Sequence, residues 1–187
     1  MTELPPTDDP TRELRRAPSL VMLNTGDGKG KSTAAMGVML RSVARGWKVA
    51  VVQFLKSGNW ATGEQKAAEQ MGVDWWAIGD GFTWDSDDLD ESAAIALKAW
   101  AKAEEVITSG EYSLVILDEV TYPLTWGWVD LDRVVEIVAT RPEHVNVILT
   151  GRDAPDALVD LADTVTVMQN VKHAYQQGIR AMKGIDF

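Results

Sequence analysis

Short apolar runs alternate along the chain with longer segments in which apolar residues recur at helical spacing. The runs are continuous rather than alternating with polar residues, which is typical of strands buried on both faces of a parallel sheet. We predict strands over residues 20–23, 48–54, 73–78, 113–117, 144–149 and 164–168. We predict helices over residues 32–44, 63–71, 90–109 and 131–139, and a further helix whose first turn contains Pro155. This order indicates an α/β fold with helices on both faces of a mostly parallel sheet.

The first residues do not share this pattern. Residues 1–19 contain four prolines and mixed charges without an apolar period, so we predict an N-terminal arm that is flexible unless something orders it. No polar linker or change of composition divides the rest of the chain. Residues 20–187 are therefore predicted to form one domain, which is long enough to bury its own core.

The composition narrows the classes of partner. The chain has 28 acidic and 18 basic residues, a net charge of −10, which disfavours a broad nucleic-acid surface because phosphate binding needs clustered cations. It has no cysteine, which excludes disulfides and thiolate metal sites. No apolar run approaches the roughly 20 residues of a membrane span, and the N-terminus has no apolar signal core. We therefore expect a cytoplasmic protein without a nucleic-acid or membrane partner.

A glycine-rich stretch lies between the first predicted strand and the first predicted helix. Backbone N–H groups at a helix start bind phosphate oxygens, and glycines let the chain curve around the anion. In such a loop Lys31 would neutralise phosphate charge and the Ser32 hydroxyl would ligate Mg²⁺. The strict P-loop pattern fails, because Thr25 stands where that pattern has glycine. The predicted nucleotide-binding residues of the stretch are Thr25, Gly26, Asp27, Gly28, Lys29, Gly30, Lys31, Ser32 and Thr33.

A second feature supports a P-loop NTPase-like fold. The apolar run 114–117 ends in Asp118 and Glu119, and at this place in P-loop folds a carboxylate meets the metal ion or its water. Acids at strand ends often only face solvent, so the pair gains weight from the glycine-rich loop that precedes it.

Several motifs resemble the P-loop type of corrinoid (cob(I)alamin or cob(I)yrinic acid a,c-diamide) adenosyltransferases. The loop is similar to that family's T-G-N-G-K-G-K-[ST]-T-A-A, including the threonine, with Asp27 in place of asparagine. Further similar motifs, in chain order, are Gln53-Phe54-Leu55-Lys56, Trp60-Ala61-Thr62-Gly63-Glu64, Gly79-Asp80-Gly81-Phe82-Thr83-Trp84, Asp118-Glu119-Val120-Thr121-Tyr122-Pro123-Leu124, Thr150-Gly151-Arg152, Val171-Lys172-His173 and the end of the chain. The resemblance covers residues 20–187.

The resemblance implies a reaction and roles for the residues of the loop. The family transfers the 5′-deoxyadenosyl group of ATP to Co(I) of a corrinoid and releases triphosphate, in adenosylcobalamin biosynthesis or salvage. Co(I) is itself a strong nucleophile, so no general base is required. Lys31, with Lys29, would offset the charge of the leaving group, and Ser32 and Glu119 would hold Mg²⁺ or Mn²⁺, with Asp118 acting indirectly.

The resemblance also implies corrinoid contacts and partners. Phe82 and Trp84 are expected beside cobalt, where apolar rings exclude water and a lower ligand and so favour reduction of Co(II); with Lys31 they are the predicted catalytic residues. Arg41 is expected to reach the nucleotide by resemblance alone. Arg152, after a strand end, is expected to contact a ligand or to form a structural ion pair. The arm is expected to fold over a corrinoid site, the protein to be a homodimer, and an external flavoprotein to supply electrons.

Two other functions remain open from the residues. One is a P-loop ATPase or kinase, which would release ADP, and the other is a non-catalytic corrinoid-binding protein that keeps ATP as a structural ligand. The sequence does not choose the corrinoid or the role of every aromatic residue. Trp100 is expected in the core, whereas Trp126 and Trp128 fit either packing or a pocket wall.

Overall fold

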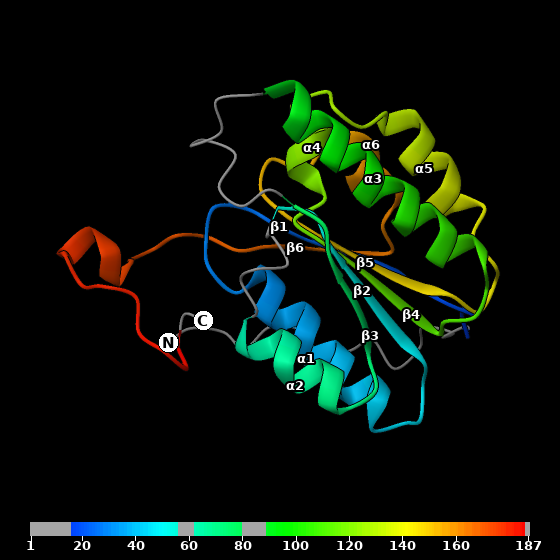
Figure 1. Cartoon of the computed structure of the whole chain (residues 1–187), viewed down its shortest axis with the longest axis horizontal. Helices are drawn as coiled ribbons and strands as arrows, with labels where there is room; N and C mark the ends of the chain where they lie inside the picture. The colour runs from blue at the N-terminus through cyan, green and yellow to red at the C-terminus, as the bar shows by residue number, and fades with distance from the viewer. Residues whose placement is uncertain (1–15, 56–61, 80–88, 186–187) are drawn as a thin grey trace, which may run out of the picture.

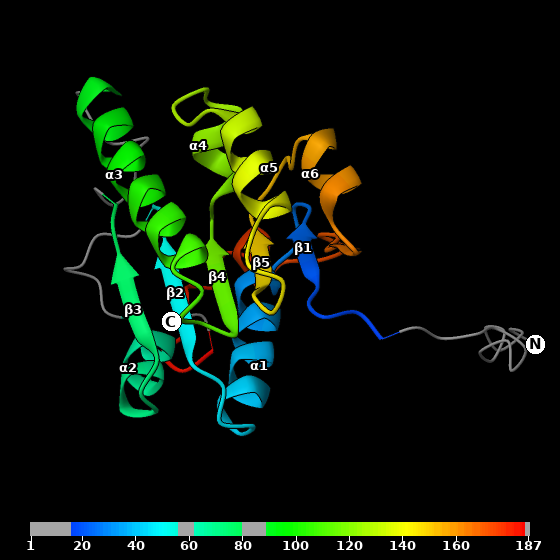
Figure 2. The same cartoon turned by 90° about the vertical axis from the view of Figure 1, so that its right-hand side faces the viewer.

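The computed structural model describes residues 16–55, 62–79 and 89–185, and six strands in this part of the chain form one sheet (Figure 1). Every pair of neighbouring strands is parallel. Figure 2 shows five of the strands side by side in the order β3, β2, β4, β5 and β1, and β6 lies beyond β1 at the edge. The strands are β1 (Val21–Thr25), β2 (Val49–Gln53), β3 (Asp74–Ala77), β4 (Leu114–Asp118), β5 (Asn146–Thr150) and β6 (Thr164–Val167).

Helices cover both faces of the sheet (Figure 1). One face carries α1 (Lys31–Val43) and α2 (Gly63–Gln70). The other carries α3 (Leu89–Thr108), α4 (Thr121–Thr125), α5 (Leu131–Ala139) and α6 (Asp156–Leu161). A 3₁₀ turn, η2 (Ala174–Gln177), follows the last strand. This is the predicted α/β, P-loop NTPase-like architecture. Within the described residues no helix has the length and apolar character needed to cross a membrane.

The central strands are buried on both sides because their side chains enter two separate cores. In β4 the residues Val115 and Leu117 face the core under α3 and α5, while Leu114 and Ile116 face the core under α1 and α2. All four side chains are at most 1% exposed. Strands with two buried faces cannot alternate apolar with polar residues, which explains the continuous apolar runs in the sequence. Trp100, 6% exposed, lies in the first of these cores as expected.

Two helices begin at a polar side chain that caps them. The Thr62 side chain caps α2 by accepting a hydrogen bond from the Gln65 backbone N–H, and Asp130 caps α5 in the same way through Asp132. The predicted strand at 144–149 is displaced in the structure: β5 begins at Asn146, since the preceding residues form a turn in which the Val145 N–H donates to the Pro142 carbonyl. The short elements α4 and η2 were not predicted.

The register of the sheet brings the polar strand ends together. Asn24 on β1 lies opposite Thr150 on β5, and Gln53 on β2 lies opposite Asp118 on β4. Strands β4, β5 and β1 are consecutive neighbours, so the segments that follow them meet at one edge of the sheet. Ligands of open α/β folds bind at this carboxyl edge.

Candidate active site

The glycine-rich loop, residues 26–30, connects β1 to α1. Thr25 is the last residue of β1 and pairs with Val167 of β6, so it belongs to the strand and needs no glycine conformation. The backbone turns at Gly26, with φ of 95°, and again at Gly30, with φ of 107°, where α1 begins. Gly30 has no side chain to cap the helix, which leaves the first-turn N–H groups of α1 suited to an anion.

Lys31 is the first residue of α1, and its side chain folds back onto the loop. Its Nζ donates hydrogen bonds to the carbonyl oxygens of Gly26, at 2.8 Å, and Gly28, at 2.6 Å. Partial burial lowers the pKa of Lys31, and the Arg152 guanidinium lowers it further, while the carboxylates of Asp27, Glu119 and Asp118 act in the opposite direction. The ammonium therefore lies where acids from two different strand ends and a second cation converge.

The two acids at the end of β4 have different surroundings. Asp118 is fully buried, and both of its carboxylate oxygens accept hydrogen bonds, from Gln53 Nε2 at 2.8 Å and from Thr150 Oγ1 at 2.7 Å. Glu119 is partly exposed and has a φ of 64°, an unusual backbone conformation for glutamate. Its N–H donates to the same Thr150 hydroxyl at 2.9 Å. These hydrogen bonds hold Asp118 in the interior, while Glu119 remains partly exposed at the end of β4.

The segment after β5 packs directly on the segment after β4. Gly151 has a φ of 146°, and a Cβ atom there would lie 1.9 Å from the Thr121 hydroxyl oxygen. That hydroxyl donates a hydrogen bond to the Arg152 carbonyl at 2.6 Å. The motif at residues 118–122 therefore packs against the motif at residues 150–152, and this contact places Arg152 beside the loop.

These segments contribute to an open cavity of about 500 Å³. It is lined by Asp27, Gly28, Lys29, Gly30, Lys31, Ser32, Thr33, Glu64, Glu119, Tyr122, Arg152, Asn170, His173 and Ile185. The structure thus brings together most of the predicted nucleotide residues, Glu119 and Arg152. Thr25, Gly26 and Asp118, which lie close to lining residues in the chain, do not line the cavity themselves. Burial raises the pKa of Tyr122, while the Arg152 guanidinium nearby lowers it.

Four polar residues of the cavity were not among the predicted site residues. Glu64, Tyr122 and His173 stand in motifs that carried the resemblance, so a signal for them was present in the sequence. Asn170 had none, because it belongs to the segment after β6, whose return to the loop depends on the tertiary fold.

The remaining predicted site residues are Arg41, Phe82 and Trp84. Arg41 lies in the last turn of α1 and lines a separate hollow of about 310 Å³ with Arg45 and Trp47, so this chain does not bring it to its own loop. Phe82 and Trp84 lie outside the described residues. The remaining unassigned rings are in contact with each other: Trp126 and Trp128 have centroids 4.7 Å apart, and neither lines the cavity.

Comparison with known proteins gives consistent relationships. Residues 17–187 match the family described as ATP:corrinoid adenosyltransferase BtuR/CobO/CobP. A corrinoid adenosyltransferase of Sinorhizobium sp is 42% identical over 90% of this chain and 80% of its own length. Those of Escherichia coli K12 and Pseudomonas aeruginosa are 39% and 38% identical, over 90% and 96% of this chain and 85% and 89% of their own lengths.

Proposed function

The chain belongs to the ATP:corrinoid adenosyltransferase family, and from that membership we propose how its carboxyl-edge cavity performs the reaction. Its substrates are ATP and a corrinoid, and the enzyme is a transferase. We infer that residues 26–33 hold the polyphosphate of ATP, so that the 5′ carbon of the ribose, rather than a phosphorus atom, faces the corrinoid. The observation that supports this most directly is the cavity itself, where the loop, Lys31 and Arg152 converge.

The proposed step is a displacement at carbon. The electron pair of Co(I) forms the cobalt–carbon bond to C5′, the bond between C5′ and the phosphate oxygen breaks, and that oxygen keeps the bonding electrons as triphosphate leaves. No proton needs to be removed from the nucleophile, so the site requires no general base. The work of the protein is to position the two substrates and to stabilise the charge that grows on the leaving oxygen.

Lys31 and the loop amides supply that stabilisation. The Lys31 ammonium already lies on the carbonyl oxygens of the loop, and a phosphate oxygen is a stronger partner for it than a neutral carbonyl. Lys29 and Arg152 line the same cavity and add positive charge. Because the chain as a whole carries a net charge of −10, this local group of cations matters for attracting a polyanion.

The residues present also suit a Mg²⁺ or Mn²⁺ ion. Magnesium at phosphate sites takes only one or two protein ligands, and phosphates and waters complete its shell. Among the described residues, no three or more histidine, cysteine, aspartate or glutamate side chains are placed so that they could hold a metal ion by themselves. Ser32 and Glu119 line the cavity and would hold the ion, which would neutralise phosphate charge when bound. Asp118, with both oxygens already hydrogen-bonded to the protein, would act indirectly.

Other features of the proposed function depend on the sequence alone. Phe82 and Trp84 would lie against the corrinoid, and Arg41 would reach a nucleotide. Residues 20–187 would form a single domain, and the arm of residues 1–19 would fold over the corrinoid. The enzyme would work as a cytoplasmic homodimer with a flavoprotein as electron donor. These stay predictions.

The proposal is tested by anaerobic incubation of the protein with chemically reduced corrinoid, ATP and Mg²⁺. We expect a light-sensitive alkylcobalt product and stoichiometric triphosphate. Lys31→Ala should reduce the rate by at least about 100-fold, because it removes a charged partner of the leaving group. Lys98→Ala, an exposed lysine on α3, is the matched control and should react like the unchanged protein. Release of ADP or orthophosphate without alkylated cobalt would refute adenosyl transfer and favour an ATPase or kinase.

A further inference from the structure

The chain after β6 returns over the phosphate loop instead of ending at the edge of the sheet. The Met168 N–H donates to the Thr25 carbonyl at 2.8 Å, and the Gly28 N–H donates to the Met168 carbonyl at 2.7 Å. Figure 1 shows the segment, coloured orange to red, leaving the body of the protein after β6 and turning back towards α1 and α2. Residues 168–185, here called the C-terminal segment, therefore form the outer wall of the cavity, to which they contribute Asn170, His173 and Ile185.

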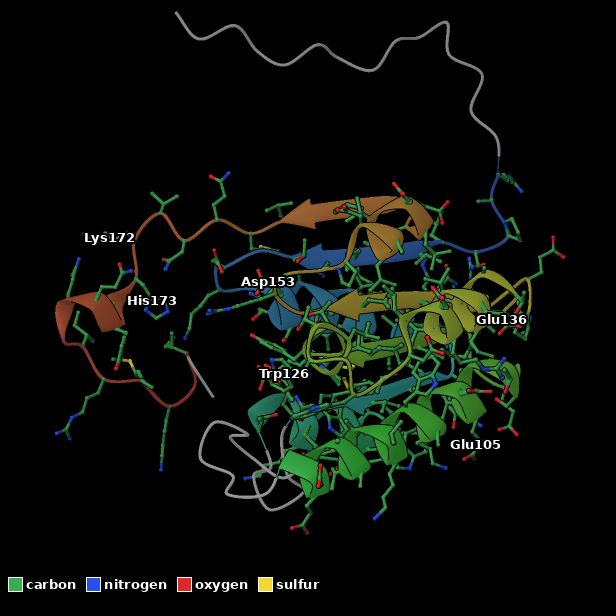
Figure 3. All side chains as sticks on the ribbon, turned by 90° about the horizontal axis from the view of Figure 1, so that it is seen from above. Glu105, Trp126, Glu136, Asp153, Lys172 and His173 are labelled. Atoms are coloured by element: carbon green, nitrogen blue, oxygen red, sulfur yellow. The ribbon has the colours of Figure 1, made fainter. Side chains whose placement is uncertain are left out.

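His173 is held in one orientation by its own backbone. Its Nδ1 accepts a hydrogen bond from the Tyr175 N–H at 3.0 Å, where it caps η2. A ring nitrogen that accepts from a backbone N–H carries no proton, so in the neutral ring the proton is on Nε2. Figure 3 shows His173 on the side of the segment that faces the body of the protein, beside Lys172. The ring thus directs an N–H donor from the outer wall of the cavity.

The cavity lined by His173 contains both acids and bases, but the space on its other side is lined by basic residues and no acid. A second hollow of about 220 Å³ adjoins the cavity and is lined by Lys29, His173, Tyr175, Arg180 and their neighbours. Lys29 and His173 line both spaces, so they form the wall between them. Residues 168–185 contain three basic residues, Lys172, Arg180 and Lys183, and the first acidic residue after them in the sequence is Asp186. An anion is the ligand that this combination of donors and charges favours.

We propose that His173 is a polyphosphate-binding residue, whose Nε2–H donates to a phosphate oxygen of ATP and of the released triphosphate across from Lys29. This inference rests on the proposed function, in which the loop holds the polyphosphate of ATP. It adds a ligand from outside the loop, so that the C-terminal segment and the loop hold the anion from two sides. The competing role is purely structural: the ring would only cap η2 and contribute nothing to binding.

Two substitutions of the same histidine separate the binding role from the capping role. In His173→Asn the side-chain oxygen takes the place of Nδ1 and can still accept from the Tyr175 N–H, but the side chain is too short to reach the position of Nε2. In His173→Gln the amide NH₂ reaches the position of Nε2, but the acceptor for Tyr175 is displaced. Binding of inorganic triphosphate, measured by calorimetry on the full chain, is the readout. Gln176→Ala on the same turn is the control, since Gln176 lines neither space.

We expect His173→Asn to bind triphosphate about tenfold more weakly than the unchanged protein, because a hydrogen bond to a charged group is lost. His173→Gln should bind within about threefold, although its thermal midpoint is lower. Equal affinity in the two variants, or weaker binding by His173→Gln alone, would overturn the proposal. Lys31→Ala separates this failure from failure of the proposed function. If Lys31→Ala binds triphosphate normally, the loop assignment is wrong; if only Lys31→Ala weakens binding, the loop assignment stands and His173 has no part in it.

Discussion

Replacement of Thr150 by valine tests the network that separates the roles of Asp118 and Glu119. Valine has nearly the shape of threonine, so the change leaves packing intact and removes only the hydroxyl. That hydroxyl is fully buried, donates to Asp118 Oδ1 at 2.7 Å and accepts from the Glu119 N–H at 2.9 Å. The variant therefore leaves a buried carboxylate short of one donor and a backbone N–H without its acceptor.

The expected cost follows from these two losses. A hydrogen bond to a charged group contributes about 1.5–3 kcal/mol, and a backbone donor left unpaired costs about 1–3 kcal/mol. Replacing a hydroxyl by a methyl group in a buried position returns up to about 1 kcal/mol. We expect Thr150→Val to lower the free energy of unfolding by about 2–4 kcal/mol. Thr150→Ser, which keeps the hydroxyl and loses one methyl group, should lower it by only about 1 kcal/mol.

Urea unfolding followed by circular dichroism measures both variants, and the midpoint of Thr150→Val should fall by roughly 1–2 M. Combining Thr150→Val with Asp118→Asn adds a check, because the valine should cost less once the carboxylate is neutral. A Thr150→Val protein at least as stable as Thr150→Ser would refute the reasoning. It would mean that the hydroxyl does not stabilise the buried carboxylate.

Two further predictions concern packing and pH. Gly151→Ala should lower the free energy of unfolding, measured by thermal denaturation, by about 3 kcal/mol, because its Cβ would lie 1.9 Å from the Thr121 hydroxyl at a φ of 146°. The control is Gly46→Ala, which has a φ of 76° and open space around its Cβ and should lower the free energy of unfolding by only about 1 kcal/mol. Equal losses in the two variants would contradict the steric argument. Burial, together with the hydrogen bond to Asp74, raises the pKa of Tyr112 from 10.0 to about 12, so its protonated form stabilises the fold below pH 10 and that contribution is lost as pH rises towards 12. Unfolding free energy measured between pH 9 and 12 should fall less steeply in Tyr112→Phe; parallel curves would be inconsistent with the shift.

The fold was largely predictable because its strands are buried on both faces. Continuous apolar runs, such as the one that forms β4, fit few structures except a buried strand when helical segments alternate with them. The predicted and observed strand boundaries differ where a turn takes the place of the strand, as at residues 142–145 before β5. The helix α4 was missed since it has five residues, with Pro123 among them, and is too short to show a period. Its position depends on the contact between Thr121 and the segment after β5.

The sequence predicted those site residues that stand in recognisable motifs. The loop, Glu119 and Arg152 meet at the carboxyl edge as expected, because β4, β5 and β1 are neighbours in the sheet. The support of Asp118 by Gln53 and Thr150 had no sequence signal, since it depends on the register between strands far apart in the chain. Arg41 is the opposite case, because the predicted helix over residues 32–44 already implied that it would lie about three helical turns from the loop.

The contact between Gly28 and residues 168–169 is made by main-chain atoms on both sides. A Cβ at Gly28 would lie 2.6 Å from the Gln169 carbonyl oxygen, and the Gly28 N–H donates to the Met168 carbonyl. Because these contacts use main-chain atoms, a substitution at 168 or 169 requires no compensating change at Gly28. Correlated substitutions between position 28 and positions 168–169 are therefore not expected, although this junction joins the loop to the end of the chain.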